Sequence, residues 1–219
     1  MKFSMRFLIT MVLCSTYCVL TACAAVNTGL ANGSSKKILL DDSISQGWVF
    51  VSDDSALKLE DVWHVEDGVL HVAGKPKGYL RTNALFSDYR LHLEWRWNAE
   101  AGNGGILLHM QPGDKVWPRC FQAQLKDEHA GDLIAMEGAD AYETASQPKH
   151  TLPHVSESSE QSVGEWNAFE IVAKDSHLEF YVNGILQNKA TELNYVAGPI
   201  GLQLEGQAID YRNIYIEYL

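Results

Sequence analysis

Apolar and polar residues alternate along several segments of this chain. The clearest is residues 91–98, Leu-His-Leu-Glu-Trp-Arg-Trp-Asn, in which every second side chain is apolar. Period-two alternation is typical of a β-strand that is buried on one face only. The polar face of this predicted strand would carry a histidine together with Glu94 and Arg96.

Three further segments, GILLHM, FQAQLKD and GLQLEG, place polar residues on one face of a predicted strand. These residues are His109, Gln122, Gln124, Gln203 and Glu205. Side by side, such strands would present a hydrogen-bonding sheet face rather than an ordinary solvated one, as in a sugar-binding surface. We therefore predict that these side chains, with Glu94 and Arg96, line one common hollow.

Turn signals separate the predicted strands at short intervals. Asp67-Gly68 and Asn183-Gly184 each stand between two strand-like runs, and such pairs tolerate the positive φ of a tight hairpin. No segment shows a sustained 3.6-residue apolar period, so we expect few and short helices. The pattern predicts an all-β fold, either a sandwich of two antiparallel sheets or a jelly roll.

Residues 127–164 interrupt this pattern with little periodicity. Loops of this length inside a domain are usually functional or disordered. The segment holds His129, Asp132, His150 and His154. Two interpretations stay open at this point: a lid or wall over the polar face, and a solvated insertion.

The first 23 residues have the layout of an export signal. Two basic residues precede an apolar run over residues 7–20, and no acidic residue is present. The run leads into Leu-Thr-Ala-Cys, which resembles a bacterial lipobox. We expect a lipoprotein-type signal over residues 1–23, lipidation of Cys23 and export to the cell envelope as an outer-membrane lipoprotein. A plain secretory signal cut near Ala24 is the alternative.

Composition indicates one globular domain after this signal. Residues 24–37 are small and polar, as in a flexible tether, and the domain is expected over residues 38–219. The chain is 46% hydrophobic and 21% charged, which is typical of a globular protein. Cys120 is the only cysteine of the domain, so no disulfide framework exists, and we interpret it as a buried packing residue.

The charge of the mature chain limits its partners. The signal contains two of the 17 basic residues and none of the 28 acidic ones, which leaves 15 against 28, a net charge of −13. Nucleic acid and anionic membrane surfaces would be repelled, so membrane contact is expected through the lipid anchor only. A neutral sugar, bound by hydrogen bonds and stacking, is the expected partner.

Ten landmarks in order resemble the family of 3-keto-disaccharide hydrolase domains over nearly the whole mature chain: GWVF, WHVEDGVLHVAG, GYLRT, LHLEWRW, NGGILL, FQAQLKD, GEWNAFEIVAKD, VNG, GPIGLQLEG and YRNIYI. The resemblance implies a concanavalin-like jelly roll that acts on sugars whose C3 hydroxyl has been oxidised to a ketone. It also implies sugar contact by Asn103, in Asn103-Gly104-Gly105. We add Asp127, at the start of the long segment, to the substrate-binding candidates.

The chain departs from the family pattern at two places. Asn-Gly-Gly stands where the family commonly has Asn-Ser-Gly, and Gln122 stands where it has a glutamate. The second departure matters more, because a carboxylate can take a proton or hold a metal whereas an amide can only donate and accept hydrogen bonds. If that glutamate is the family's base, this protein either binds sugar without cleaving it or uses another acid, such as Glu94 or Glu205.

A 3-keto glycoside can be cleaved by elimination, which needs a base for the C2 proton and a partner for the enolate oxygen. We assign Glu94 and His109 as catalytic candidates, and Arg96, Gln122, Gln124, Gln203 and Glu205 as substrate-binding ones. Simpler interpretations are a Glu94–Arg96 pair, a structural His109 and a structural pair of Asp210 and Arg212.

The leading hypothesis is a cell-envelope enzyme that cleaves 3-keto glycosides or 3-keto-disaccharides. The alternative is a carbohydrate-binding lipoprotein of the same fold without the chemistry, and a purely structural envelope protein is a third interpretation. The abundance of histidine and acidic residues is compatible with a divalent cation, but no ligand spacing is diagnostic, so the sequence leaves the cofactor undecided.

Overall fold

The computed structural model describes residues 35–41 and 46–219. The predicted signal, Cys23 and most of the predicted tether lie outside these residues, so lipidation and the envelope location stay predictions. The last two residues of the predicted tether, Lys36 and Lys37, belong to the first strand. The described residues belong to one compact unit, Ser34–Leu219.

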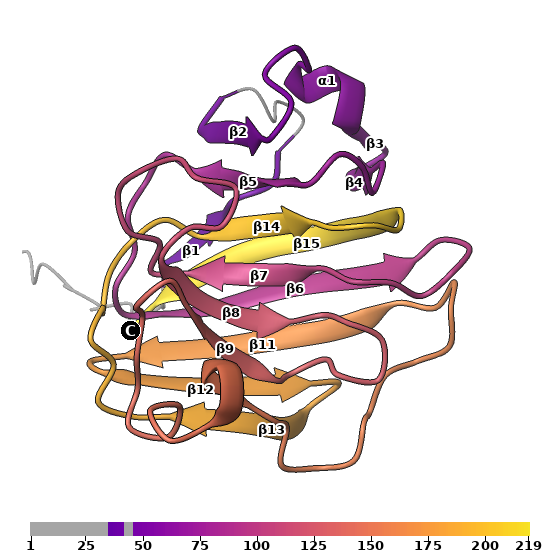
Figure 1. Ribbon diagram of the computed structural model, residues 1–219. Helices are drawn as coiled ribbons and strands as arrows, with labels where there is room; N and C mark the ends of the chain where they lie inside the picture. The colour runs from indigo at the N-terminus through magenta and orange to yellow at the C-terminus, as the bar shows by residue number, and fades with distance from the viewer. Residues whose placement is uncertain (1–34, 42–45) are drawn as a thin grey trace, which may run out of the picture. The chain divides into compact units, whose positions relative to one another are not determined.

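Two antiparallel sheets are stacked on each other (Figure 1). In spatial order, sheet A consists of β13 (Ile185–Ala190), β12 (His177–Val182), β11 (Asn167–Lys174), β6 (Tyr89–Trp97), β15 (Ile209–Tyr218), β4 (Val69–Val72) and β3 (Trp63–Glu66), with β1 (Lys36–Ile38) also paired to β15. Sheet B consists of β10 (Thr151–Leu152), β9 (Leu133–Met136), β8 (Cys120–Gln124), β7 (Gly105–Leu108), β14 (Gly201–Leu204), β5 (Gly78–Thr82) and β2 (Trp48–Ser52).

Helical structure in the described residues is limited to two short elements, α1 (Leu59–Val62) and the 3-10 helix η1 (Pro148–His150). Neither is long or apolar enough to cross a membrane. The all-β jelly-roll sandwich predicted from the sequence is therefore confirmed, as is the scarcity of helices.

Strand β6 shows how the sequence pattern produces this sandwich. Its residues alternate strictly between buried and partly exposed along all nine positions. Leu91, Leu93 and Trp95 are fully buried and belong to one core cluster with Phe121 and Ile106 of sheet B. Burial of each such side chain contributes about 1.5–3 kcal/mol to folding, so the space between the sheets is the core of the domain.

Both predicted hairpins are present. Asp67 and Gly68 connect β3 to β4 with φ of 50° and 75°, and Asn183 and Gly184 connect β12 to β13 with φ of 49° and 80°. Two successive positive φ angles match the right-handed twist of the flanking strands, which explains why Asp-Gly and Asn-Gly occupy these turns.

The long segment over residues 127–164 is only partly loop. It contains β9, which is an interior strand of sheet B, and the short strand β10 at the edge. The expectation of a segment with little regular structure is therefore wrong for residues 133–136. Their sequence, Leu-Ile-Ala-Met, lacks polar alternation because both faces of β9 are covered or half-covered.

The sandwich has two outer faces, and they carry different residues. On sheet A the outer face includes the polar side chains of β6, since the apolar ones point into the core. On sheet B, Phe121 and Ala123 of β8 face the core, so Cys120, Gln122 and Gln124 face outward. Cys120 is a fully buried free thiol beside Met136, which confirms its interpretation as a packing residue.

Candidate functional site

Three glutamines on the outer face of sheet B form a connected chain, which we call the glutamine row: Gln122 and Gln124 of β8, and Gln203 of β14. The Gln122 Nε2 atom donates to Gln124 Oε1 at 3.1 Å and to Gln203 Oε1 at 3.0 Å. All three residues are buried. Since buried amides with partners have fixed orientations, the row presents a defined pattern of donors and acceptors.

A glycine makes this row continuous across the strand that separates its members. Gly105 of β7 lies opposite Gln124 of β8, between the two strands that carry the glutamines. A Cβ atom added there would lie 2.5 Å from Gln122 Nε2, too close for any real contact. The absence of a side chain at Gly105 therefore lets the Gln122 amide reach across β7 to Gln203.

At one end of the row, Glu205 accepts hydrogen bonds from three different segments. Its carboxylate contacts Lys77 Nζ at 3.1 Å, Asn103 Nδ2 at 3.0 Å and Gln203 Nε2 at 3.2 Å. Lys77 directly precedes β5, Asn103 lies just before β7, and Glu205 directly follows β14. These strands are neighbours, so their ends bring the four groups together.

A hollow of about 700 Å³ opens at this point, lined by Gly74, Lys75, Pro76, Lys77, Asn103, Glu205 and Gly206. We call it the Glu205 hollow; its volume is within the range of small-molecule sites. The Oδ1 atom of Asn103 is buried and has no hydrogen-bond partner among the described residues. An unpaired buried acceptor beside a carboxylate is suited to a ligand hydroxyl.

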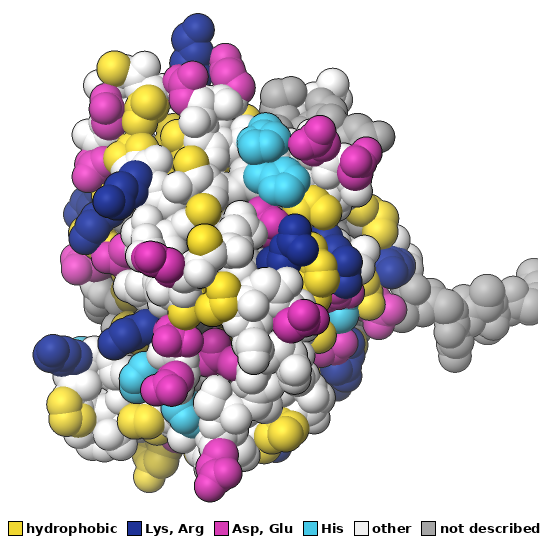
Figure 2. All heavy atoms as spheres, turned by 90° about the vertical axis from the view of Figure 1, so that its right-hand side faces the viewer, with side chains coloured by type: hydrophobic (Ala, Val, Ile, Leu, Met, Phe, Trp, Pro, Cys, Tyr) yellow, Lys and Arg dark blue, Asp and Glu magenta, His cyan; other side chains and the backbone are white. Residues whose placement is uncertain are grey.

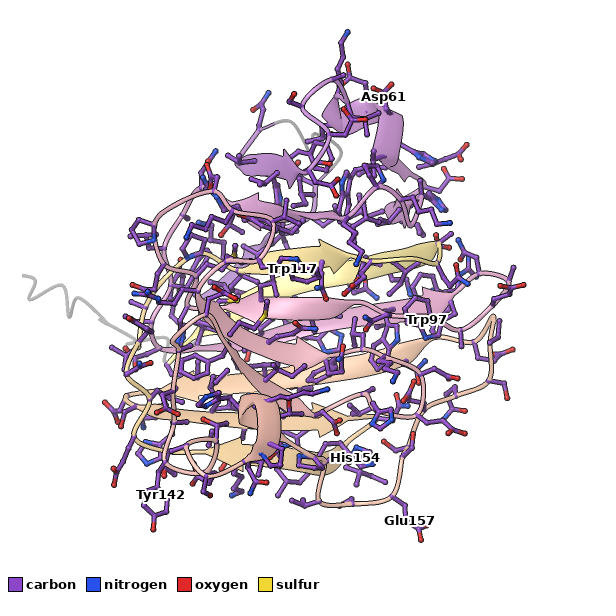
Figure 3. All side chains as sticks on the ribbon, in the orientation of Figure 1. Asp61, Trp97, Trp117, Tyr142, His154 and Glu157 are labelled. Carbon is purple, nitrogen blue, oxygen red and sulfur yellow. The ribbon has the colours of Figure 1, made fainter. Side chains whose placement is uncertain are left out.

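An aromatic side chain stands next to the Glu205 hollow. Trp117 is 39% exposed, and Lys77 Nζ lies 5.4 Å from its ring centroid. In Figure 3 this tryptophan lies in front of the middle of sheet B. An exposed indole can stack on the apolar face of a sugar ring, while the polar groups around it hold hydroxyls.

Glu94 and Arg96 do not share this face. Both belong to β6 of sheet A, and their side chains lie on the outer face of that sheet, across the core from the glutamine row. Glu94 lines a separate hollow of about 550 Å³ with His92 and Tyr215. The prediction of one common hollow for all the polar residues is therefore wrong.

Glu94 is engaged by the last strand rather than by Arg96. Its carboxylate accepts hydrogen bonds from Arg212 Nε at 2.6 Å and from Asn213 Nδ2 at 2.7 Å. Burial raises the pKa of Glu94, but the hydrogen bonds from Asn213 and Arg212 and the Arg212 charge outweigh it and hold the pKa below its usual value. A carboxylate with a lowered pKa is a weak base near neutrality.

Arg96 also pairs with β15. Its guanidinium donates to the buried carboxylate of Asp210 at 2.9–3.0 Å, and Asp210 further accepts His71 Nδ1 at 2.8 Å. The expected pairs Glu94–Arg96 and Asp210–Arg212 are thus replaced by the cross-strand pairs Glu94–Arg212 and Arg96–Asp210. Antiparallel register explains this, since Arg212 lies opposite Glu94 and Asp210 opposite Arg96.

His109 is fully buried and lies in neither hollow. The strand ends at Leu108, and His109 adopts a φ of 50°, which breaks the alternation that would have placed it beside Leu107 on the outer face. Its Nδ1 atom lies 3.0 Å from the carbonyl oxygen of Tyr195, and its ring packs edge-on against Tyr89 and Phe121. The prediction that His109 is on the polar face is wrong.

The buried His109 should make stability depend on pH. Burial lowers its pKa, although the Tyr195 carbonyl and Asp88 act in the opposite direction. The folded protein therefore resists a proton that the unfolded chain accepts near pH 6.5, so stability falls as pH falls below that value. Urea unfolding at pH 7.5 and 5.5 measures how much unfolding free energy is lost on acidification. We expect this loss to be smaller for His109→Gln than for the parent, by up to about 1.4 kcal/mol per pH unit. Equal losses would contradict this role.

The remaining candidates lie near the glutamine row. Asp127 is exposed beyond the end of β8, and its backbone N–H donates to Gly102 at 3.0 Å. Five predicted substrate-binding residues, Asn103, Gln122, Gln124, Gln203 and Glu205, thus form one connected set, with Asp127 close to its edge. Sequence reasoning missed Lys77 and Trp117, because neither belongs to an alternating strand.

Two groups in the described residues have the composition and spacing of metal ligands. His129, Asp132 and His154 form one, and His64, Glu66 and His71 form the other; within each group the ligand atoms lie within 4.8 Å of one another. Figure 2 shows histidines gathered at two separate places among acidic side chains. No ligand spacing in the sequence had indicated either group.

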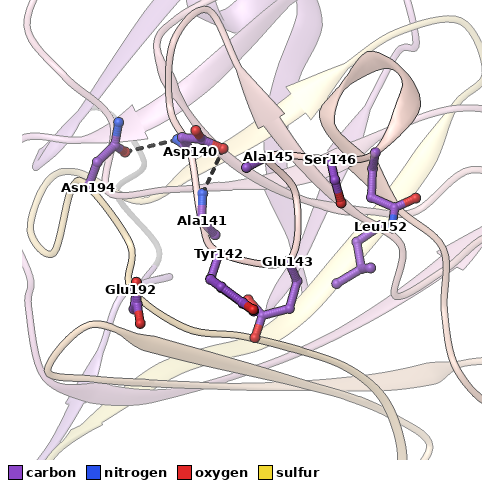
Figure 4. A pocket seen from close by; sticks show the side chains of 10 residues that line it. Asp140, Ala141, Tyr142, Glu143, Ala145, Ser146, Leu152, Glu192 and Asn194 are labelled. Atoms are coloured by element: carbon purple, nitrogen blue, oxygen red, sulfur yellow. Dashed lines mark hydrogen bonds between the residues drawn. The ribbon is translucent and has the colours of Figure 1, made fainter.

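A larger hollow, of about 830 Å³, lies elsewhere and is shown in Figure 4. Two of its acidic side chains, Asp140 and Glu143, already accept hydrogen bonds from neighbouring residues. Asp140 accepts the backbone N–H of Ala141, and Glu143 accepts both the backbone N–H and the hydroxyl of Thr191 at 2.7–2.8 Å. These carboxylates stabilise loop junctions, so volume alone does not make this hollow the site.

Comparison with known proteins adds to this geometry. A family model described as 3-keto-alpha-glucoside-1,2-lyase-like domain matches residues 35–217. No match was found among curated protein sequences.

Solved structures share the fold at low sequence identity. A Parabacteroides distasonis protein provisionally described as a glycosyl hydrolase has a TM-score of 0.64 at 20% identity, covering 84% of this chain and 100% of that one. The β-glucanase of Bacillus licheniformis has a TM-score of 0.59 at 12% identity, covering 86% and 99%. The carbohydrate-binding module CBM66 of Bacillus subtilis has a TM-score of 0.57 at 12% identity, covering 78% and 95%.

Proposed function

The chain belongs to the family of 3-keto-alpha-glucoside-1,2-lyase-like domains, and we propose that it cleaves the glycosidic bond of 3-keto glycosides or 3-keto-disaccharides on the outer face of sheet B. Family membership gives the protein a carbohydrate-related function. The connected set from Gln124 through Gln122 and Gln203 to Glu205 carries the proposal, because it joins oriented amides to a carboxylate beside a hollow of sugar size.

In the proposed reaction, a base takes the proton from C2 of the sugar, next to the C3 ketone. The C2–H electron pair forms an enolate with charge on the C3 oxygen. The enolate then collapses to a C1=C2 double bond as the C1–O bond breaks, and the leaving oxygen takes a proton. Addition of water, with the hydroxyl on C1 and a proton on C2, completes net hydrolysis.

Glu205 is the candidate base of this account. Lys77, Asn103 and Gln203 hold its carboxylate at the mouth of the Glu205 hollow. The Lys77 ammonium and the nearby side-chain amides provide positive charge and N–H donors for a developing enolate oxygen, which is the kind of stabilisation that such a transition state needs. Trp117 is placed to stack on the sugar ring.

Elimination can be distinguished from direct displacement by its products. Incubation of the protein with a 3-keto glucoside in D₂O should release the aglycone and give a 3-keto glucose that carries deuterium at C2, as read by NMR. Product without deuterium at C2, after control for non-enzymatic exchange, would contradict elimination. Saturable binding without any release would favour a carbohydrate-binding protein instead.

A further inference from the structure

A histidine cluster, composed of His129, Asp132 and His154, lies beside the glutamine row. The His154 Nδ1 atom lies 2.6 Å from Asp132 Oδ1, and the His129 Nδ1 atom lies 3.1 Å from Asp132 Oδ2. The two oxygens of one carboxylate therefore each contact an imidazole nitrogen. Figure 3 labels His154 next to the lower strands of the sandwich.

The cluster is built into the edge of sheet B rather than onto a free loop. Asp132 directly precedes β9 and lies opposite Gln124, to which it is joined by a backbone hydrogen bond of 2.9 Å. Gln122 on the outer face lies opposite Ile134, so Asp132, two residues away, shares this face with the row. The Asp132 carboxylate is buried, with a residue exposure of 7%.

A buried amide fixes the two segments that supply the cluster. Asn188 of β13 is 1% exposed, and its Nδ2 atom contacts the carbonyl oxygens of Gly131, Leu152 and Pro153 at 3.0–3.2 Å. The backbone N–H of His154 also donates to Asp132 Oδ1 at 2.8 Å. Both segments are thus held before any ligand arrives, which lowers the entropy lost on binding.

The charge around the cluster favours a cation. The Glu160 carboxyl accepts the backbone N–H of Ala130, between His129 and Asp132, at 3.1 Å, and Asp127 stands two residues before His129 in the chain, so two further acidic residues lie near the cluster. In the described part of the chain, no ion pair connects a lysine or arginine to the histidines or to Asp132.

The second group, His64, Glu66 and His71, lacks this property. His71 binds the Asp210 carboxylate, which also accepts the guanidinium of Arg96 at 2.9 Å. The fixed positive charge of Arg96 already neutralises this carboxylate, and His64 and Glu66 are exposed. This group therefore serves as an internal control.

We propose that His129, Asp132 and His154 form a binding site for a divalent transition-metal ion of the Zn²⁺ type at the edge of the proposed sugar site. Two imidazoles and one carboxylate are a common ligand set for such ions and leave coordination positions open for water or a substrate oxygen. Binding of the ion does not depend on the proposed function. A role of the bound ion in polarising a sugar oxygen does rest on that function.

Calorimetric titration of Zn²⁺ into chelator-treated, untagged protein tests the site. We expect one equivalent to bind, with proton release, because metal-bound histidine nitrogens must be deprotonated. His129→Gln and His154→Gln should each weaken binding at least about tenfold. Asp132→Asn should do the same, but His129 is the more exposed residue and its variant is the safer test of a folded protein.

The control variant His64→Gln/His71→Gln should bind Zn²⁺ like the parent. Absence of saturable binding, or binding that is lost in the control and kept in His129→Gln, would overturn the proposal. Because the readout is heat of binding, a protein that binds Zn²⁺ but cleaves no 3-keto sugar would refute the proposed function alone.

Discussion

Glu205→Gln should lower kcat/KM for 3-keto glucoside cleavage by about 100-fold or more, the usual contribution of a general base. The substitution removes the group that takes the C2 proton but keeps an oxygen that can accept from Asn103 and Gln203. The fold should therefore survive, and sugar binding should weaken much less than turnover. Aglycone release, measured with the parent and the variant at equal protein concentration, gives the ratio of their kcat/KM values.

Glu94→Gln is the matched control on the opposite sheet. It removes a carboxylate that pairs with Arg212, whose side chain is partly exposed, so we expect a stability loss of about 1 kcal/mol or less and nearly unchanged cleavage. If instead Glu94→Gln abolished cleavage and Glu205→Gln did not, the active site would lie on sheet A and the present assignment would be wrong.

Gln122→Glu should destabilise the domain by about 2–4 kcal/mol at neutral pH without raising activity. The new carboxylate would face the Oε1 atoms of Gln124 and Gln203, which now accept from Gln122. Gln124 cannot turn freely, because its Oε1 also accepts the backbone N–H groups of Leu125 and Lys126.

The loss of stability caused by Gln122→Glu should depend on pH. Burial against two acceptors would raise the pKa of the new carboxyl in the folded state above its value of about 4.3 in the unfolded chain. The loss of unfolding free energy is therefore complete above the folded-state pKa, and it shrinks as pH falls toward about 4.3. Gln122→Met, which removes the same hydrogen bonds without adding an acid, should show a deficit that does not change with pH. A gain in cleavage by Gln122→Glu would mean that the missing family carboxylate, and not Glu205, is the base.

Local features were predictable because they depend on neighbouring residues. The alternation in β6 predicted a strand with one buried face, and the Asp-Gly and Asn-Gly pairs predicted hairpins, since both reflect short-range geometry. The grouping of Gln122, Gln124, Gln203 and Glu205 on one face was also predicted from alternation and is what the structure contains.

The assignment of strands to sheets was not predictable in the same way. Alternation predicts that Glu94 and Gln124 both point away from the core. A sandwich has two outer faces, however, and the pattern is identical on each. Only the pairing of β6 with β11 and β15, which are distant in sequence, places Glu94 on sheet A.

Backbone irregularities account for the other errors. His109 follows the last strand residue with a φ of 50°. A bulge at Asn213, with a φ of 53°, places Ile214 and Ile216 in the core, whereas strict alternation from Arg212, which faces outward, would have turned them outward as well. Asn and His adopt positive φ more often than most residues, but they do so at few of their positions, so residue type alone does not locate these two irregularities. The cluster around Asp132 was hidden because its members are brought together by β9 and the segment after β10.

Side-chain NMR of the ¹⁵N-labelled protein tests the central claim, that the sugar binds the outer face of sheet B. The ligand is the 3-keto derivative of 1,5-anhydroglucitol, which has no leaving group at C1. We predict saturable shifts of the side-chain amide signals of Gln122, Gln124, Gln203 and Asn103 and of the Trp117 indole. Shifts confined to the indole of Trp166, which lies between Arg96 and Arg212 on sheet A, would contradict the account.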